Sequence, residues 1–359
     1  MAKTKHFGAL AAAVGALVAA SLLVLVLVVV KPQPGRAALP GTNGLIAYSG
    51  IDPIDGDWEI FAINPDLGGA RGRQLTFNNT TDSNPCYSPD GNRIGYLGRT
   101  ANNDYQIFTM PATGGQRVQV TPTTVMNPTD CSFTGPRGTH IVYSAYDGPL
   151  PKRDREIFTI PANGGTPTQL IDNLDADDSP SFTVVGRQIA YSGNSSDPYQ
   201  DIFTIPANGG TPTQLTFSTR SPNVDPDYRP DGQRIVYSHF QRGSHNQPLD
   251  YEIQTTSTTG GLGQRLTSTT SRIHDRNPVY SPNGQQIAYT RTGGVGDSSD
   301  SEIFTIPATG GQPVQVTFNN TGDHDPSWQP QLGINEIRQV VDTVRNQREG
   351  RGTGGAETR

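Results

Sequence analysis

Short apolar segments alternate with clusters of turn-forming residues along most of the chain, and the same segments return at a nearly constant spacing. The clearest marker is a segment of the type Ile-x-Tyr, whose isoleucines stand at six positions: Ile46, Ile94, Ile141, Ile189, Ile235 and Ile287. The steps between them are 48, 47, 48, 46 and 52 residues. Self-similarity at such a period is the signature of a repeat architecture. The sequence therefore predicts six copies of one unit.

One copy, residues 187–232, contains four such segments in the order IAYSG, DIFTIPANGG, TPTQLTF and DPDYRPDG. Each is short, rich in β-branched or aromatic residues and bounded by Gly, Pro, Asn or Asp, a pattern typical of strands. The Ile-Phe-Thr-Ile segment has apolar residues on both sides, so both of its faces should be covered. The third segment carries a proline in several copies and belongs at a sheet edge, because proline cannot donate a hydrogen bond. Each copy is expected to be a four-stranded antiparallel sheet.

Sheets with two apolar faces must stack on one another, and stacking them around an axis gives an all-β, six-bladed β-propeller over residues 44–330. A parallel β-helix would have much shorter repeats, and an immunoglobulin-type array would need domains of about 100 residues. The first copy lacks a Pro-x-aromatic segment of its own, whereas residues 326–330 provide a surplus one after the last copy. We expect the circle to be closed by pairing of residues 326–330 with the first blade, which leaves no open edge.

The N-terminal segment differs in character from the repeats. Lys3 and Lys5 precede an apolar run over residues 7–30. As a helix this run would be about 36 Å long, enough to cross a hydrocarbon core of about 30 Å. We therefore predict a transmembrane signal anchor at residues 1–30 and a linker at residues 31–43, with the propeller outside the cytoplasm, periplasmic or extracellular. The alternative is a signal peptide cleaved near Ala37 and Ala38, which would give a secreted protein.

The C-terminal segment and the composition add further limits. Ile334, Ile337, Val341 and Val344 have helical spacing, so residues 331–359 are expected to form a short helix and a disordered tail. A hydrophobic fraction of 33%, with 41 Gly and 29 Pro, suits many strands and turns. The formal net charge of −6 argues against nucleic-acid binding, because no basic stripe is present to neutralise phosphates.

The chain has two cysteines, Cys86 and Cys131, which fall at the start of the Pro-x-aromatic segment in successive copies. Adjacent sheets would bring them close together, and an oxidising compartment permits a disulfide. A slip of one residue in the irregular segment 130–138 would place them beyond bonding distance. The alternative is two small buried residues.

The connections between strands divide between two faces of the predicted propeller. The Pro-Asp-Gly and Gly-Gly turns share one face, because successive strands are antiparallel. The connections after Ile-x-Tyr and before Pro-x-aromatic share the other, which we call the variable-loop face, since residues 145–155, 239–250 and 291–300 differ there in length and charge. Variable loops on a rigid scaffold often carry recognition. We expect this face to bind a protein or cell-envelope component; the alternative is that the loops are plain connectors.

Acidic residues and two histidines gather at the start of the Pro-x-aromatic segments: Asp82, Asp177, Asp178, Asp225, Asp275, Asp323, Asp325, His274 and His324. If that strand is innermost, these residues would surround the mouth of the central channel. They could then hold a divalent cation such as calcium or attract a basic peptide. Alternatively, they are turn residues that hydrogen-bond their own backbone. No catalytic residue, resident metal or cofactor is assigned, because the sequence lacks a Gly-x-Ser-x-Gly elbow, an HExxH motif and a phosphate-cradling loop.

The segment from Tyr87 through Pro89-Asp90-Gly91 to Tyr96 resembles the WD40-like repeat of TolB-type six-bladed propellers, and residues 280–289 do so as well. The Ile-Phe-Thr-Ile-Pro-Ala-x-Gly-Gly and Gln-Leu-Thr segments fit the same family, and the resemblance covers residues 44–330. It implies an extracytoplasmic propeller that binds envelope proteins such as a peptidoglycan-associated lipoprotein. TolB carries an α/β domain before its propeller, for which residues 31–43 leave no room, and this departure counts against a Tol–Pal role.

Other members of the family attach the propeller to an α/β-hydrolase domain as a gate, and no segment of this sequence matches such a domain. Taken together, the sequence predicts an exported, monomeric propeller that acts as a non-catalytic binding module. The alternative is a metal-assisted lyase or hydrolase with its site at the channel mouth.

Overall fold

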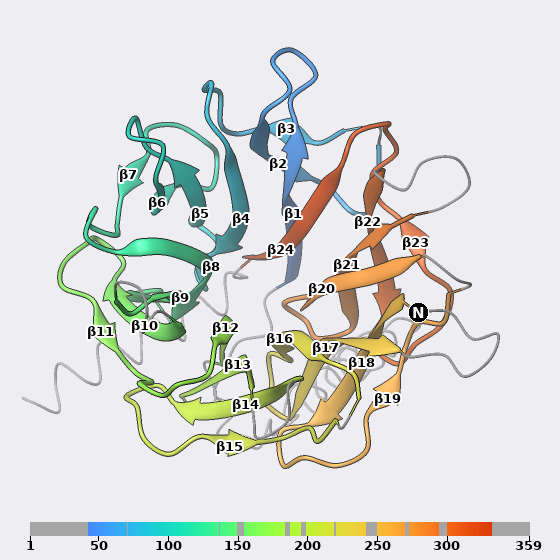
Figure 1. Cartoon of the computed structure of the whole chain (residues 1–359). Helices are drawn as coiled ribbons and strands as arrows, with labels where there is room; N and C mark the ends of the chain where they lie inside the picture. The colour runs from blue at the N-terminus through green and yellow to red at the C-terminus, as the bar shows by residue number, and fades with distance from the viewer. Residues whose placement is uncertain are drawn as a thin grey trace, which may run out of the picture. The chain divides into compact units, whose positions relative to one another are not determined.

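The structure is a computed structural model that describes residues 42–331 except 70, 136, 149–153, 184–186, 195–198, 219, 242–249, 270–272 and 294–299. These residues form six four-stranded antiparallel sheets arranged as the blades of a propeller (Figure 1). The predicted all-β, six-bladed propeller is therefore confirmed. The predicted membrane helix at residues 1–30 and the C-terminal helix and tail lie outside the described residues. Within the described part of the chain, no helix is long and apolar enough to cross a membrane.

Each blade uses the four repeated segments in the expected order. The Pro-x-aromatic segments form the innermost strands β4 (Asp82–Tyr87), β8 (Met126–Thr134), β12 (Asp177–Thr183), β16 (Asn223–Tyr228), β20 (His274–Tyr280) and β24 (Asp323–Gln331). The Ile-x-Tyr segments form the second strands β1 (Thr42–Ile51), β5 (Arg93–Arg99), β9 (His140–Tyr146), β13 (Gln188–Asn194), β17 (Arg234–Gln241) and β21 (Gln286–Thr292).

The outer half of each blade is formed by the remaining two segments. The third strands are β2 (Trp58–Ile63), β6 (Tyr105–Pro111), β10 (Arg155–Pro161), β14 (Gln200–Pro206), β18 (Asp250–Ser257) and β22 (Ser301–Pro307). The outermost strands have two residues each: β3 (Arg73–Gln74), β7 (Val118–Gln119), β11 (Thr168–Gln169), β15 (Thr213–Gln214), β19 (Gln264–Arg265) and β23 (Val314–Gln315). Such short edge strands offer little template for pairing with another chain.

The first blade combines strands from both ends of the described chain. Strand β24 pairs antiparallel with β1, and Ile46 lies opposite Trp328. The indole N–H of Trp328 donates to the Gly44 carbonyl at 3.2 Å. Innermost strands of successive blades touch all the way round, β4 with β8 and so on to β20 with β24 and β24 with β4. The segment left over in the sequence thus supplies the innermost strand of the first blade.

The core lies between neighbouring blades. The tyrosine of each Ile-x-Tyr strand is buried and in five blades stacks on the phenylalanine of the next strand, as Tyr48 does on Phe61 with ring centroids 5.7 Å apart. One cluster joins Ala47 and Ile60 of the first blade to Ile94 and Tyr96 of the second. The apolar residues on both faces of each sheet are therefore covered by the neighbouring blades, which is where the hydrophobic effect stabilises the fold.

Close approach of two blades requires one glycine in particular. Gly91, in a Pro-Asp-Gly turn, has a φ of +69°, and a Cβ there would lie 2.0 Å from the Pro330 carbonyl oxygen. Any larger residue would collide with the backbone of the adjoining blade. The turn residues of the repeat therefore also determine how the blades fit together.

Candidate functional site

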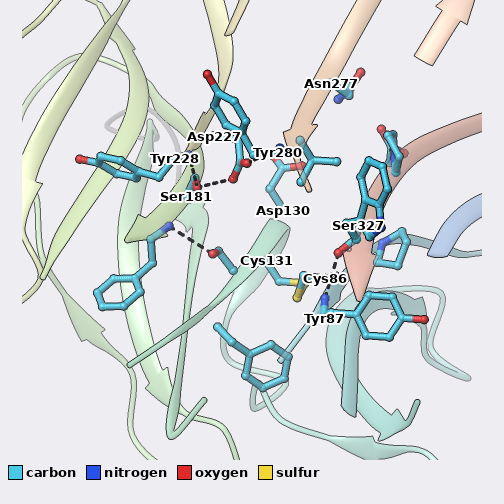
Figure 2. A pocket seen from close by; sticks show the side chains of 18 of the residues that line it. Cys86, Tyr87, Asp130, Cys131, Ser181, Asp227, Tyr228, Asn277, Tyr280 and Ser327 are labelled. Carbon is cyan, nitrogen blue, oxygen red and sulfur yellow. Dashed lines mark hydrogen bonds between the residues drawn. A yellow bond between two sulfur atoms is a disulfide. The ribbon is translucent and has the colours of Figure 1, made fainter. Parts of the chain in front are cut away.

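The six innermost strands surround a central cavity of about 300 Å³. Every blade contributes residues to its wall, and Figure 2 shows side chains from several blades pointing toward one another across it. The strands reach from the variable-loop face, where each begins, to the face of the Pro-Asp-Gly turns. Residues at equivalent positions of the six repeats thus line this cavity on the propeller axis.

Each innermost strand places a residue in a left-handed backbone conformation, with φ between 42° and 56°, at an equivalent position: Asn84, Asp130, Ser179, Asp225, Asn277 and Asp325. Strand β8 has a second such residue, Asn127. The pairing with the second strand shifts register at these places, as between Ser83 and Cys86. Asn and Asp tolerate this conformation better than most residues. A bulge of this kind re-aims a side chain, and all six residues line the cavity. We call them the inner ring.

Hydroxyl groups of the preceding blade hold the inner ring in place. The backbone N–H of Asn84 donates to Ser49 Oγ at 2.9 Å, and that of Asp225 donates to Ser192 Oγ at 3.1 Å. Asn277 and Asp325 donate in the same way to Ser238 and Thr290, at 3.2 and 3.1 Å. The hydroxyl residue that follows Ile-x-Tyr in most repeats therefore satisfies an amide that the bulge removes from the strand ladder.

The inner ring gathers carboxyl groups with altered acidity. Burial raises the pKa of Asp130 to about 8, and the charges of Asp178, Asp325 and Asp225 add to the effect. Burial, with the charge of Asp225, likewise raises the pKa of Asp325 to about 6. Asp130 accepts a hydrogen bond from Asn84 Nδ2 at 2.9 Å. Like charges this close disfavour full ionisation, so Asp130 holds a proton at neutral pH for most of the time.

A second layer lies one step further along the innermost strands. Asp227 accepts hydrogen bonds from the Tyr280 N–H and from Ser181 Oγ, both at 2.8 Å, so it joins three blades (Figure 2). Burial raises its pKa to about 6. Cys86 and Cys131 form a disulfide between the second and third blades, with their Cα atoms 5.9 Å apart. This layer connects neighbouring blades.

The nine residues expected at the channel mouth fall into separate places. Asp82, Asp177, Asp275 and Asp323 are at most 2% exposed and lie between blades, away from the cavity wall. Asp225 and Asp325 belong to the inner ring. Asp178 accepts a hydrogen bond from Ser144 and pairs with Arg155 Nε at 3.7 Å. The one continuous acidic rim expected from the sequence is thus divided, because the bulge places neighbouring residues on different sides of the strand.

The buried aspartates act as links between blades. Asn319 donates its backbone N–H to Glu302 at 2.6 Å and its side-chain amide to Asp323 at 2.7 Å. Asn78 and Asn173 make the same two bonds in the first and third blade connections. Asp275 instead forms a bidentate ion pair with Arg291, at 2.7 and 2.8 Å. These aspartates are therefore neither free ligands nor simple turn residues.

The two histidines also have structural partners. His324 Nε2 lies 2.7 Å from Ser301 Oγ, and its ring lies 5.1 Å from that of Trp58. His274 Nδ1 accepts the Tyr251 N–H at 3.3 Å. Within the described residues, no group of three or more His, Cys, Asp or Glu side chains is placed to hold a metal ion. The calcium site and the lyase or hydrolase alternative remain sequence-based predictions.

Sequence reasoning missed four members of the inner ring, Asn84, Asp130, Ser179 and Asn277, and the second-layer Asp227. A signal for them was present. In five of the six copies a small polar residue directly precedes the strand proline, and in the third copy Asp130 precedes Cys131 at the equivalent place. A polar residue before proline in a strand indicates a bulge whose side chain leaves the strand face.

Aromatic and arginine side chains meet where the blades reach the variable-loop face. Arg99 lies over Tyr105 with 5.0 Å between its Cζ atom and the ring centroid, and Arg155 lies over Tyr146 at 4.7 Å. Arg276 lies over Tyr251 at 4.3 Å. We call these three pairs the aromatic–arginine rim. Tyr, Trp and Arg are the residues that dominate protein-binding hot spots.

Large apolar side chains are exposed on the same face. Ile54 and Leu174 are 89% and 91% exposed and lie in connections of the variable-loop face. Phe77 and Phe318 are exposed beside the Gly-Gly turns of the next blade instead: Phe77 shares a groove with Gly114 and Gly115, and the Phe318 N–H donates to the Gly69 carbonyl at 2.9 Å. On the opposite face, the β2–β3 and β18–β19 turns expose Leu67 and Leu262. The variable-loop face therefore combines exposed apolar side chains with the aromatic–arginine rim around an acidic cavity.

The comparisons with known proteins agree with this architecture. Residues 149–332, just over half of the chain, match the family model of the TolB β-propeller domain. The chain belongs to the TolB β-propeller family. No curated protein matches it.

Solved structures with similar folds include TolB from Acinetobacter baumannii, at 19% identity and a TM-score of 0.66, over 80% of this chain and 67% of that one. A putative TolB from Agrobacterium tumefaciens is 18% identical with a TM-score of 0.59, over 80% of this chain and 99% of the other. An oligogalacturonate lyase in complex with manganese is 14% identical with a TM-score of 0.53, over 76% and 73%. At such identities these likenesses show the fold alone.

Proposed function

We propose that this chain is an exported, membrane-anchored TolB-like propeller that binds a protein or cell-envelope component without catalysing a reaction. The apolar run at residues 7–30 would anchor it, with the propeller outside the cytoplasm. Membership of the TolB family and the disulfide between Cys86 and Cys131 support export, since disulfides persist in oxidising compartments.

The observation that carries the proposal is the composition of the variable-loop face. Ile54, in the first blade, and Leu174, in the connection between the third and fourth blades, are 89% and 91% exposed on this face. Exposed apolar side chains near stacked arginine–aromatic pairs offer apolar area and directional hydrogen bonds to a partner. A six-bladed scaffold holds these side chains rigidly, so that binding loses little conformational entropy.

The inner ring gives the face a preference for positive charge. Asp225 and Asp325 lie on opposite sides of the asparagine-bearing β20. Asp130 adds little charge at neutral pH, because its raised pKa keeps it protonated. Carboxyl groups in a concave, protein-walled site focus a negative potential. A lysine or arginine of the partner that enters the cavity would be attracted there, while apolar side chains of the partner would cover Ile54 and Leu174.

The experiment is a pull-down from envelope extract with the full-length chain as bait. The test variant carries Ile54→Ser and Leu174→Ser; the matched control carries Leu262→Ser in the β18–β19 turn on the opposite face. We expect the control to recover the same partner as the native chain and the test variant to lose it. Equal recovery by both variants would contradict the proposal. Loss by the control alone would place the binding site on the Gly-Gly turns instead.

A further inference from the structure

A groove of about 410 Å³ lies between the outer parts of the first and second blades. It is lined in part by the outermost strand β3, whereas the central cavity is lined by the innermost strands. Arg73 of β3 forms part of one wall, and Arg117, just before β7, forms part of the other. Arg73 Nη1 donates to the Thr113 carbonyl at 3.1 Å, which uses one of its five N–H donors. Arg117 lies over Phe108 at 4.5 Å and pairs with the buried Asp82 at 3.3 Å.

The repeats provide an internal comparison for this groove. At the other five blade boundaries, the residues that correspond to Arg73 are Val118, Thr168, Thr213, Gln264 and Val314, and those that correspond to Arg117 are Pro167, Pro212, Gly263, Pro313 and Gly72. Two facing arginines therefore occur at one of the six boundaries. The scaffold does not need them, because five boundaries form without them.

A buried hydroxyl also lines this groove. Tyr96 is fully buried, and its hydroxyl, like those of the equivalent Tyr143 and Tyr289, finds no partner at hydrogen-bond geometry among the described residues; Tyr96 is the one of these three that lines the groove with two arginines. Its equivalent in the first blade, Tyr48, accepts the Gly72 N–H at 2.7 Å. Arg117 stands at the place of that glycine in the second blade, and it is the Arg117 side chain that interacts with the Tyr96 phenol. Burial raises the pKa of Tyr96 above its ordinary value, so the phenol keeps its proton and can donate it.

We propose that the groove between the first and second blades binds an organic monocarboxylate, held by Arg73, Arg117 and the Tyr96 hydroxyl. The planar fork of arginine matches a carboxylate in two parallel hydrogen bonds. The positive charge of the two guanidinium groups is offset in part by the Asp82 and Glu59 carboxyl groups, which also act on Tyr96, and the small remaining charge suits a monoanion better than a phosphate dianion. The exposed ring of Phe77 lines the same groove and offers a flat apolar surface to a ring-bearing ligand.

The test uses benzoate as the probe and neutral benzamide as its matched partner, with binding to the full-length chain followed by calorimetry. We expect benzoate to bind more tightly than benzamide and than inorganic phosphate, and Arg73→Gln to weaken benzoate by about ten-fold or more. Arg229→Gln, in a Pro-Asp-Gly turn elsewhere, should leave binding unchanged. Galacturonate and N-acetylphenylalanine then separate a sugar acid from a peptide carboxyl group, by which of the two binds more tightly.

Tyr96→Phe keeps the proposal distinguishable from a purely structural role. Because the Tyr96 hydroxyl has no partner at hydrogen-bond geometry among the described residues, removing it should not lower stability, and the variant should unfold at the native temperature or slightly above. The same variant should bind benzoate several-fold more weakly. Equal binding of benzoate and benzamide, tighter binding of phosphate, no benzoate binding, or native affinity in both Arg73→Gln and Tyr96→Phe would overturn the proposal.

Discussion

Glu156 and Asp177 lie on neighbouring blades, are both buried, and are joined by one residue, Asn173. The Asn173 N–H donates to Glu156 at 2.8 Å, and its side-chain amide donates to Asp177 at 2.8 Å. Glu156 Oε2 has no hydrogen-bond partner among the described residues. Burial raises the pKa of Glu156 to about 7 and that of Asp177 to about 8, with the Glu156 charge adding to the latter. The contact between these two blades is therefore most stable when one of the two carboxyl groups is protonated.

The stability of the propeller should depend on the charge state of this pair. A carboxyl group whose pKa is raised on folding stabilises the native state fully below its unfolded value near 4.5, and that stability is lost as pH rises through about 7 to 8. We expect Glu156→Gln to flatten the decline in the free energy of unfolding between pH 5 and pH 8, by on the order of 2 kcal/mol. Urea unfolding at a series of pH values measures this.

A control for this prediction comes from within the chain. Gln106 occupies the position of Glu156 in the second blade, accepts the Thr121 hydroxyl at 2.6 Å and donates to the Val125 carbonyl at 3.1 Å. An amide at this position is therefore compatible with the fold. Gln106→Ala should lower stability equally at all pH values. A parallel pH profile for native chain and Glu156→Gln would show that Glu156 is ionised throughout.

The disulfide should stabilise the contact between the second and third blades. It joins residues separated by 45 positions, and cross-links of this kind typically contribute about 2–4 kcal/mol. We expect Cys86→Ala with Cys131→Ala to lower the free energy of unfolding by about that amount, and reductant to do the same to the native chain. Guanidinium titrations with and without reductant measure both effects. The free energy of unfolding of the double variant should not change when reductant is added. If reductant also leaves that of the native chain unchanged, the prediction is contradicted.

The Ser238 hydroxyl, which holds one residue of the inner ring in place, should contribute measurably to the free energy of unfolding. Ser238 Oγ accepts the Asn277 N–H at 3.2 Å and donates to Asp225 at 3.0 Å. Ser238→Ala leaves a buried amide without its acceptor, so we expect a loss of about 1–3 kcal/mol in thermal or urea unfolding. Thr290 makes the equivalent bond in the sixth blade, so Ser238→Thr, which keeps the hydroxyl, provides a comparison that should retain the native stability. Full stability of Ser238→Ala would argue that water replaces the hydroxyl.

Most of the fold follows from residue periodicity. Six Ile-x-Tyr segments and a strand pattern of two apolar faces suffice for six stacked sheets, because no other packing covers both faces. The proline at the edge strand and the glycines of the turns determine the strand order. Even the surplus segment around Trp328 shows which strand belongs to the first blade.

The site could be predicted only in part, because side-chain direction in a strand depends on register. A strict alternation places residues two apart on the same face. The left-handed residue at Asp225 or Asp325 interrupts this alternation, so in five of the six blades the inner-ring residue turns to the cavity while the aspartate or asparagine two positions earlier turns to the blade boundary. Proline spacing indicates where the interruption falls, but one sequence alone does not show which side each carboxylate takes.

The central structural claim, on which the two faces and the cavity depend, is that Thr42 and Gln331 lie opposite one another in one blade although 289 positions separate them. The most direct test is the variant Thr42→Cys with Gln331→Cys, oxidised under mild conditions and mapped by mass spectrometry. The structure predicts an intramolecular disulfide in the monomer in high yield, beside the native bridge. The control pair Thr42→Cys with Leu262→Cys should not cross-link. Failure of the first pair to form, or formation only between molecules, would contradict the composite first blade.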